Sequence, residues 1–165
     1  MTPALRLLLA LFVGLGAAGA APAQDAGPVL RGQALDGRAY DLAQRRGRVV
    51  MVVLWRSNCR VCMDKLPELR TNAQGWKTAP FDLVLVNLDA DAGDAATYDR
   101  LRRQVAGRED GVHGFWHGHL QLPAAWAASA RLPRTLVIDR EGRIAGDHAG
   151  RVPAEAWNQV ADLLP

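Results

Sequence analysis

An apolar run that leads straight into a pair of cysteines constrains the fold of this chain more than any other feature. Residues 49–55 are continuously apolar and rich in β-branched side chains, and Cys59 and Cys62 follow within a few positions. Such a run is too short for a typical helix and suits a strand buried on both faces. The pattern over 59–73 is helical. The cysteines are therefore expected where a buried strand passes into a helix.

The rest of the chain predicts a small α/β sandwich with a mixed sheet. Asp36-Gly37 lies between two short mixed runs and indicates an N-terminal β-hairpin. Ser57 and Asn58 are the candidate caps of the first helix. The remaining expected elements are strands at 81–88, 136–138 and 143–149, and helices at 94–106 and 153–164. Residues 107–123 are the least legible, and Arg100, Arg102 and Arg103 are expected to give the second helix a solvated face.

The length of the chain indicates a single domain, and its charge argues against nucleic-acid binding. The chain has 165 residues and a formal net charge of +3, which suit one domain and argue against a nucleic-acid-binding surface, because the basic residues are scattered. Residues 1–23 are typical of a signal peptide, with an apolar core and an Ala21-Pro22-Ala23 cleavage signal. We therefore expect cleavage near Ala23, a mature domain at 24–165 and a periplasmic location. An uncleaved N-terminal anchor is the alternative.

The Cys59-x-x-Cys62 spacing is compatible with three interpretations: a zinc site, a structural disulfide and a redox-active dithiol. A zinc site needs two further ligands, and the sequence has no second cysteine pair. A structural disulfide that closes so short a loop contributes only about 2 kcal/mol. A thiol at a helix N-terminus is instead favoured as the thiolate, and a second thiol one turn later can resolve a mixed disulfide. Dithiol–disulfide exchange is the preferred reading.

Two further segments are expected beside the cysteines. Leu132-Pro133 directly precedes a strand. An ordinary edge proline is one reading, and a cis peptide that frees backbone groups to pair with an extended substrate is the other. Trp55, at the end of the buried run, is expected to lie close to the disulfide and shield it.

Together these residues resemble the thioredoxin-like family, and most closely its exported TlpA/ResA-like branch, which includes the cytochrome c maturation thioredoxins. The resemblance covers residues 29–164. It rests on Leu35-Asp36-Gly37-Arg38, Leu42, Gly47-Arg48-Val49-Val50, Leu54-Trp55, Cys59-x-x-Cys62, Pro67, Val86-Asn87-Leu88-Asp89 and the stretch 132–144.

The resemblance implies a thioredoxin fold, in which helices flank a mixed central sheet. It also implies that Cys59 is the attacking cysteine, Cys62 the resolving one and Pro133 a cis-proline. Leu132, Pro133 and Trp55 are the expected substrate-binding residues. No cofactor is expected.

Three departures from the family pattern stand around the cysteines. Asn58 replaces the usual tryptophan, Val61 the usual proline, and Lys65 a glutamate that the branch often carries. Arg56, Arg60 and Lys65 then crowd the site with positive charge, and no matching acid is evident. We hypothesise that Arg60, Val61 and Lys65 modulate the site, that the Cys59 thiolate is unusually stable, and that the protein is less reducing than its relatives.

The expected activity is therefore exported thiol–disulfide exchange, most simply the reduction of protein disulfides with a membrane protein as electron donor. A DsbA-type oxidase usually has a large helical insertion, for which this chain has no room. The rival reading is a non-catalytic copper- or haem-handling module that uses the cysteines with His113, His117 and His119. A degenerate thioredoxin-like adaptor is a third possibility.

Overall fold

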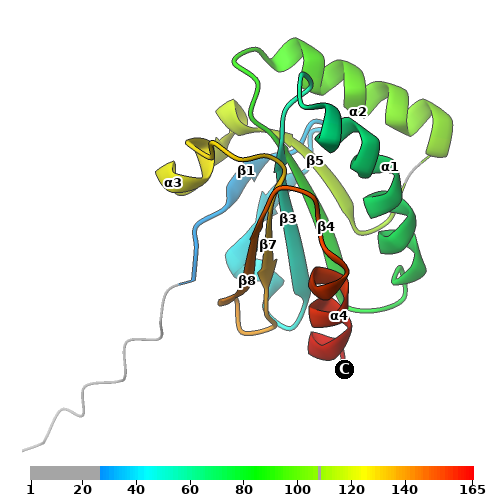
Figure 1. Ribbon diagram of the computed structural model, residues 1–165, viewed down its shortest axis with the longest axis vertical. Coiled ribbons are helices and arrows are strands. Elements are labelled where there is room, and N and C mark those ends of the chain that lie inside the picture. Colours follow the sequence, from blue (N-terminus) through cyan, green and yellow to red (C-terminus); the bar gives the residue numbers. More distant parts are fainter. Residues whose placement is uncertain (1–26, 108) are drawn as a thin grey trace, which may run out of the picture.

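A computed structural model describes residues 27–165 apart from residue 108, and this part of the chain forms two β-sheets with helices around them (Figure 1). The strands are β1 Arg31–Gln33, β2 Ala39–Asp41, β3 Val49–Trp55, β4 Phe81–Asn87, β5 Val112–Trp116, β6 Leu120–Gln121, β7 Arg134–Ile138 and β8 Ile144–Ala149. The α-helices are α1 Arg60–Gly75, α2 Ala92–Ala106, α3 Ala124–Ala127 and α4 Ala154–Leu163. Short 3-10 turns are Leu42–Arg45 and His117–His119.

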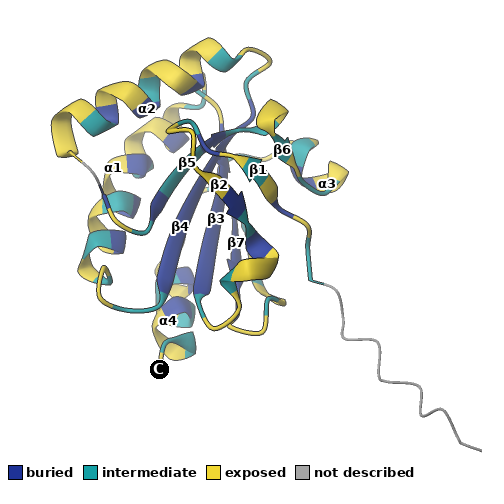
Figure 2. Cartoon of the chain, turned by 180° about the vertical axis from the view of Figure 1, so that it is seen from behind, coloured by how far each residue is buried: buried dark blue, intermediate teal, exposed yellow. Residues whose placement is uncertain are grey.

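The central sheet has the strand order β5-β4-β3-β7-β8. Strands β3, β4 and β5 are parallel, whereas β7 and β8 are antiparallel to their neighbours. Every residue of β3 and β4 is buried (Figure 2). The two apolar runs therefore form the middle of the sheet, as their composition predicts.

Side chains on the two faces of this sheet form separate cores. On one face, alternate residues of β3 pack with Leu66 and Leu69 of α1 and with Val160 of α4. On the other face, the intervening residues pack with Tyr40 of β2 and Trp126 of α3. The fold thus has three layers, and the mixed sheet flanked by helices is confirmed.

The N-terminal hairpin is also confirmed, with β1 antiparallel to β2. Gly37 has φ 84° in its turn, a conformation that favours glycine. The stretch 107–123 supplies β5 and β6, and β6 pairs with β1 to give a three-stranded sheet. The signal peptide expected at 1–23 lies outside the described residues, and among the described helices none is long and apolar enough to cross a membrane.

The prediction that Arg102 lies on a solvated face of α2 is wrong. Its side chain is only 5% exposed and forms ion pairs with Asp99, at 2.5 Å, and with Glu109, at 2.6 Å. Arg70 of α1 also pairs with Glu109, at 3.0 Å. The partners of Arg102 come from the preceding helical turn and from the loop after α2, so the guanidinium is buried with its charge compensated.

A second buried charge cluster lies where β3 and β4 begin. The carboxylate of Asp82 accepts a hydrogen bond from Arg48 at 2.9 Å and lies 3.5 Å from Nε2 of His113. The ring of His113 packs 5.0 Å from that of Tyr40. Burial alone would raise the pKa of Asp82, but hydrogen bonds from His113 and Arg48 hold it below its ordinary value.

Candidate functional site

Cys59 and Cys62 form a disulfide with their Cα atoms 5.2 Å apart. Cys59 is the N-terminal cap of α1, and its Sγ accepts the backbone N–H of Cys62 at 3.2 Å. The prediction that Ser57 or Asn58 caps the helix is therefore wrong. Ser57 is instead hydrogen-bonded to Asp89, which follows β4, and to Asp94 in α2. Sγ of Cys59 lies at the helix N-terminus, where unpaired N–H groups and the helix dipole favour a thiolate.

The two sulfurs differ in exposure. Cys62 is 1% exposed and belongs to the core on the α1 face, whereas Cys59 is partly buried and packs against that core. Cys59 is thus the more exposed cysteine of the pair. Val61, between them, is 38% exposed.

Trp55 lies in the same core as Cys62 and packs its ring 4.8 Å from the ring of Tyr98. It is only 2% exposed, so its ring lies within the protein. That Trp55 binds substrate stays a prediction.

The Leu132–Pro133 peptide is cis, as the sequence predicts. Register places it at the same edge of the sheet as the cysteines, because Leu54 pairs with Arg134 across β3 and β7. Leu132 packs partly buried against the core that Cys59 also touches, and Pro133 itself is buried. The carbonyl of Pro133 accepts the N–H of Gly150 at 2.7 Å, so it is already paired.

Arg134 holds this edge together. Its guanidinium donates two hydrogen bonds to Asp147 on β8, at 2.9 and 2.8 Å. It also donates to the carbonyl of Ala125 and the hydroxyl of Ser129, which lie in and just after α3. The hydrogen bonds from Arg134 lower the pKa of Asp147. The segment that carries Leu132 and Pro133 is therefore held between α3 and the sheet.

The sequence reading missed Asp89 as a site residue. Its carboxylate oxygens accept the backbone N–H of Ser57, each at 3.2 Å, and the side-chain amide of Asn87, at 2.8 Å. Its carbonyl accepts the indole N–H of Trp116 at 2.8 Å and lies 3.1 Å from Nε2 of His117. Asp89 thereby joins the turn before Cys59 to the ends of β4 and β5. Its place directly after a buried strand was the available signal.

The predicted cluster of unpaired positive side chains around the cysteines is only partly present. Lys65 forms an ion pair with Glu68, three residues further along α1, so the prediction that it has no matching acid is wrong. Arg56 donates to the carbonyl of Leu88 at 3.1 Å. Arg60 is exposed beside Cys59. The positive charge next to the disulfide thus comes mainly from Arg56 and Arg60.

The three histidines of the rival reading do not converge. His113 faces Asp82 in the buried cluster, His117 lies beside Asp89, and His119 packs against the ring of Trp116. Among residues 27–107 and 109–165, no group of three histidine, cysteine, aspartate or glutamate side chains is arranged to hold a metal ion. The described part of the chain therefore does not support that reading.

Comparison with known proteins agrees with this geometry. The family model described as Redoxin matches residues 18–164. A solved structure from Chlorobium tepidum, assigned as the thiol:disulfide interchange protein DsbE, is 28% identical, with a TM-score of 0.64 over 82% of this chain and 92% of that one. No curated protein matches significantly.

More distant solved structures share the fold. The exposed lipoprotein thioredoxin of Streptococcus pneumoniae is 20% identical, with a TM-score of 0.58 over 81% of this chain and 98% of that one. StoA of Bacillus subtilis is 14% identical, with a TM-score of 0.58 over 81% and 96%.

Proposed function

Because the chain belongs to the Redoxin family and is a thioredoxin-like thiol–disulfide oxidoreductase, we propose that it is an exported reductase of protein disulfides. The observation that carries this proposal is the unequal exposure of its two sulfurs, with Cys59 at the helix N-terminus and Cys62 in the core. A reductase needs one thiolate that meets the client and a second thiol that meets only its partner cysteine.

In the proposed reaction, the Cys59 thiolate attacks one sulfur of the client disulfide. The client S–S bond breaks, a mixed disulfide forms, and the second client sulfur leaves as a thiolate that takes a proton. Cys62 then loses its proton to water and attacks Sγ of Cys59. The mixed disulfide breaks, and two electrons have passed to the client, which leaves as a dithiol.

The products on this chain are the oxidised cysteines, the state found in the structure. A further turnover therefore needs two electrons from another dithiol, and we propose that a membrane thiol–disulfide donor supplies them. The resemblance to the TlpA/ResA-like branch supports a role in cytochrome c maturation, and the expected signal peptide at 1–23 supports a periplasmic location.

The test of the site uses reduced protein and a synthetic peptide with one internal disulfide. Cys62→Ser is expected to accumulate the mixed disulfide through Cys59, detected by mass spectrometry, whereas Cys59→Ser accumulates none. The wild-type protein is expected to yield reduced peptide and its own disulfide. Trapping by Cys59→Ser instead would reverse the two roles, and inertness of both thiols would overturn the proposal.

Direction and export have separate tests. Equilibration with glutathione buffers is expected to give a reduction potential well below the value of about −120 mV found for the oxidase DsbA. A potential near that value would make the protein an oxidase. Expression of the full sequence in a bacterium with a periplasm is expected to yield a mature chain that begins at Gln24. A protein that retains residues 1–23 in the cytoplasm would contradict export.

A further inference from the structure

The register of the central sheet gathers four segments around the disulfide. Trp55 pairs with Asn87, Leu54 pairs with Arg134, and Arg134 pairs with Ala149. The segments that continue from these positions therefore meet at one edge of the sheet. They are 56–60, 88–91, 131–133 and 150–151.

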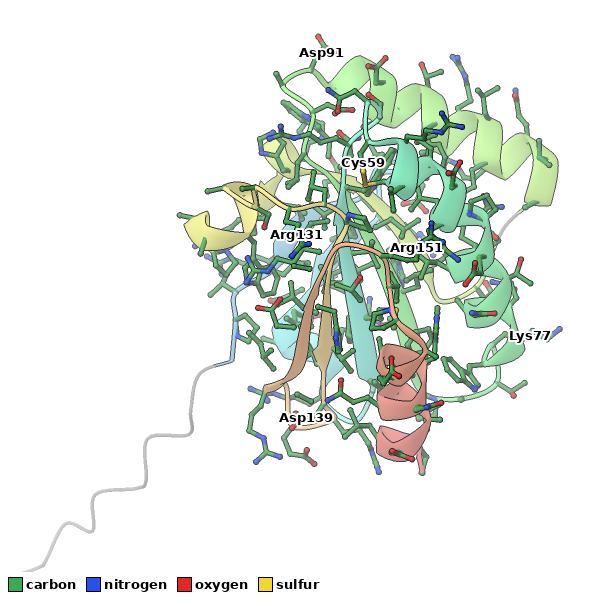
Figure 3. The ribbon with its side chains drawn as sticks, in the orientation of Figure 1. Cys59, Lys77, Asp91, Arg131, Asp139 and Arg151 are labelled. Atoms are coloured by element: carbon green, nitrogen blue, oxygen red, sulfur yellow. A yellow bond between two sulfur atoms is a disulfide. The ribbon has the colours of Figure 1, made fainter. Side chains whose placement is uncertain are left out.

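Charge is divided unequally between these segments. Arg131 and Arg151, on the β7 and β8 side, are both exposed, and neither forms an ion pair within the described residues. A Cβ placed on Gly150 would lie 3.8 Å from Nε of Arg131, so this guanidinium packs over the residue next to Arg151. Figure 3 shows the two arginines on the same side of Cys59. Together they form a cationic flank of the site.

On the opposite side of the disulfide, acidic side chains after β4 lie near Arg56 and Arg60, so the positive charge there is offset. Asp89 and Asp94 bond to Ser57, and Asp91 caps α2. In Figure 3, Cys59 lies between Asp91 on one side and Arg131 and Arg151 on the other. Arg134, a third arginine on the β7 side, is already paired with Asp147 and adds little net charge.

We propose that Arg131 and Arg151 recognise client segments rich in aspartate or glutamate next to the disulfide that Cys59 attacks. This inference rests on the proposed function and names the class of partner. A client chain that reaches Cys59 from the Leu132–Pro133 side would come close to both arginines. Exposed charges of this kind act mainly on the association rate and are screened by salt.

The test uses two peptides with the same internal disulfide, flanked by glutamates in one and by lysines in the other. Single-turnover reduction by the prereduced wild-type protein is expected to be about tenfold faster for the acidic peptide at low ionic strength. The preference is expected to disappear in about 1 M salt, where the Debye length falls to about 3 Å. The salt series needs no variant.

A charge-reversal pair assigns the effect to residues. Arg131→Glu/Arg151→Glu is expected to favour the lysine peptide. The matched control, Lys77→Glu/Arg140→Glu, makes the same change in net charge away from the disulfide and is expected to keep the acidic preference. Figure 3 shows Lys77, and Asp139 next to Arg140, far from Cys59. A preference that survives in Arg131→Glu/Arg151→Glu overturns the assignment.

Reduction of neutral hydroxyethyl disulfide by the wild-type protein separates this inference from the proposed function. Equal rates for both peptides at all salt concentrations, with hydroxyethyl disulfide also reduced, overturn the acidic preference and leave the reductase intact. Failure to reduce any of the three disulfides overturns the reductase, and the inference with it.

Discussion

The carboxylate of Asp89 accepts the backbone N–H of Ser57, two residues before Cys59. The same carboxylate accepts the side-chain amide of Asn87, whose own carbonyl oxygen accepts the N–H of Asp89 at 2.9 Å. Asn87 is fully buried, so its amide has one fixed orientation. The turn that leads into α1 is thus attached to the end of β4 through a pair of side chains.

We predict that Asp89→Asn slows exchange between Cys59 and hydroxyethyl disulfide about tenfold, the kinetic equivalent of about 1.4 kcal/mol. Whichever way the new amide turns, its N–H₂ faces either the N–H₂ of Asn87 or the backbone N–H of Ser57, and Asn87 cannot turn without losing its bond from the N–H of residue 89. The exchange variant Asn87→Asp/Asp89→Asn restores the donor–acceptor match and is expected to recover most of the rate.

Asp91→Asn is the control for charge, since Asp91 caps α2 and, within the described part of the chain, makes no hydrogen bond to the turn before Cys59. Its rate is expected to match the wild-type rate. Faster exchange in Asp89→Asn, with a lower pKa of Cys59, would show that this carboxylate acts through its charge and not by positioning the turn.

Lys65 offers a second test of the site. We expect Lys65→Glu to raise the pKa of the Cys59 thiol, because it replaces a positive by a negative charge one turn beyond Cys62. A rise of about one unit corresponds to about 1.4 kcal/mol and lowers the reduction potential by about 30 mV. Ultraviolet absorbance of the thiolate measures the pKa, and glutathione buffers measure the potential.

Glu68→Gln is the matched variant, because it removes the acidic partner of Lys65 and leaves the lysine unpaired. The pKa of Cys59 is expected to fall in this variant. If neither substitution moves the pKa, the charge on Lys65 does not reach the sulfur, and the hypothesis that this residue modulates the site is wrong.

Acid is expected to destabilise the fold through Asp82. Its folded pKa lies below the ordinary value of 3.8, so its contribution is complete above that value and is lost as pH falls towards the folded pKa. Asp82→Asn is expected to lose about 2 kcal/mol at about pH 7 and to show a flatter stability profile below about pH 4. Urea unfolding across this range measures both.

Asp36→Asn is the surface control, since Asp36 pairs with Arg38 on the exposed hairpin turn. Its cost is expected to stay below about 1 kcal/mol. Equal losses in the two variants would mean that water reaches the Asp82 cluster as freely as it reaches the surface.

Removal of the buried arginine on α2 is expected to be costly. Arg102→Met leaves Asp99 and Glu109 buried with less compensation, so the free energy of unfolding is expected to fall by about 3 to 5 kcal/mol. Arg100→Met, on the exposed side of the same helix, is expected to change it by less than about 0.5 kcal/mol. A loss below about 1 kcal/mol for Arg102→Met would contradict the burial of the cluster.

The sequence predicts the features that depend on local patterns. Residues 49–55 are all apolar, and residues 81–87 are apolar except for Asp82 and Asn87. This pattern predicts two central strands. The cis bond at Pro133 and the hairpin around Gly37 are predicted from short motifs together with the family resemblance. In each case, the motif lies within a few residues of the feature.

Features that depend on distant partners could not be predicted. Nothing in the sequence around Arg102 distinguishes it from an exposed helix arginine, because its burial depends on the ion pair with Glu109 in the following loop. Ser57 looks like a helix cap, but Asp89 and Asp94, more than thirty positions away, bind it instead. Sequence spacing alone does not give the sheet register that brings these groups together.

Arg134 has a consequence for the entropy of client binding. It bonds at once to α3, to the loop that follows it and to β8, so the backbone around Leu132 and Pro133 has few conformations left to lose. A client that lies along this backbone would give up its own freedom alone. Binding of a weakly structured client there would therefore lose less free energy to ordering than binding to a flexible surface.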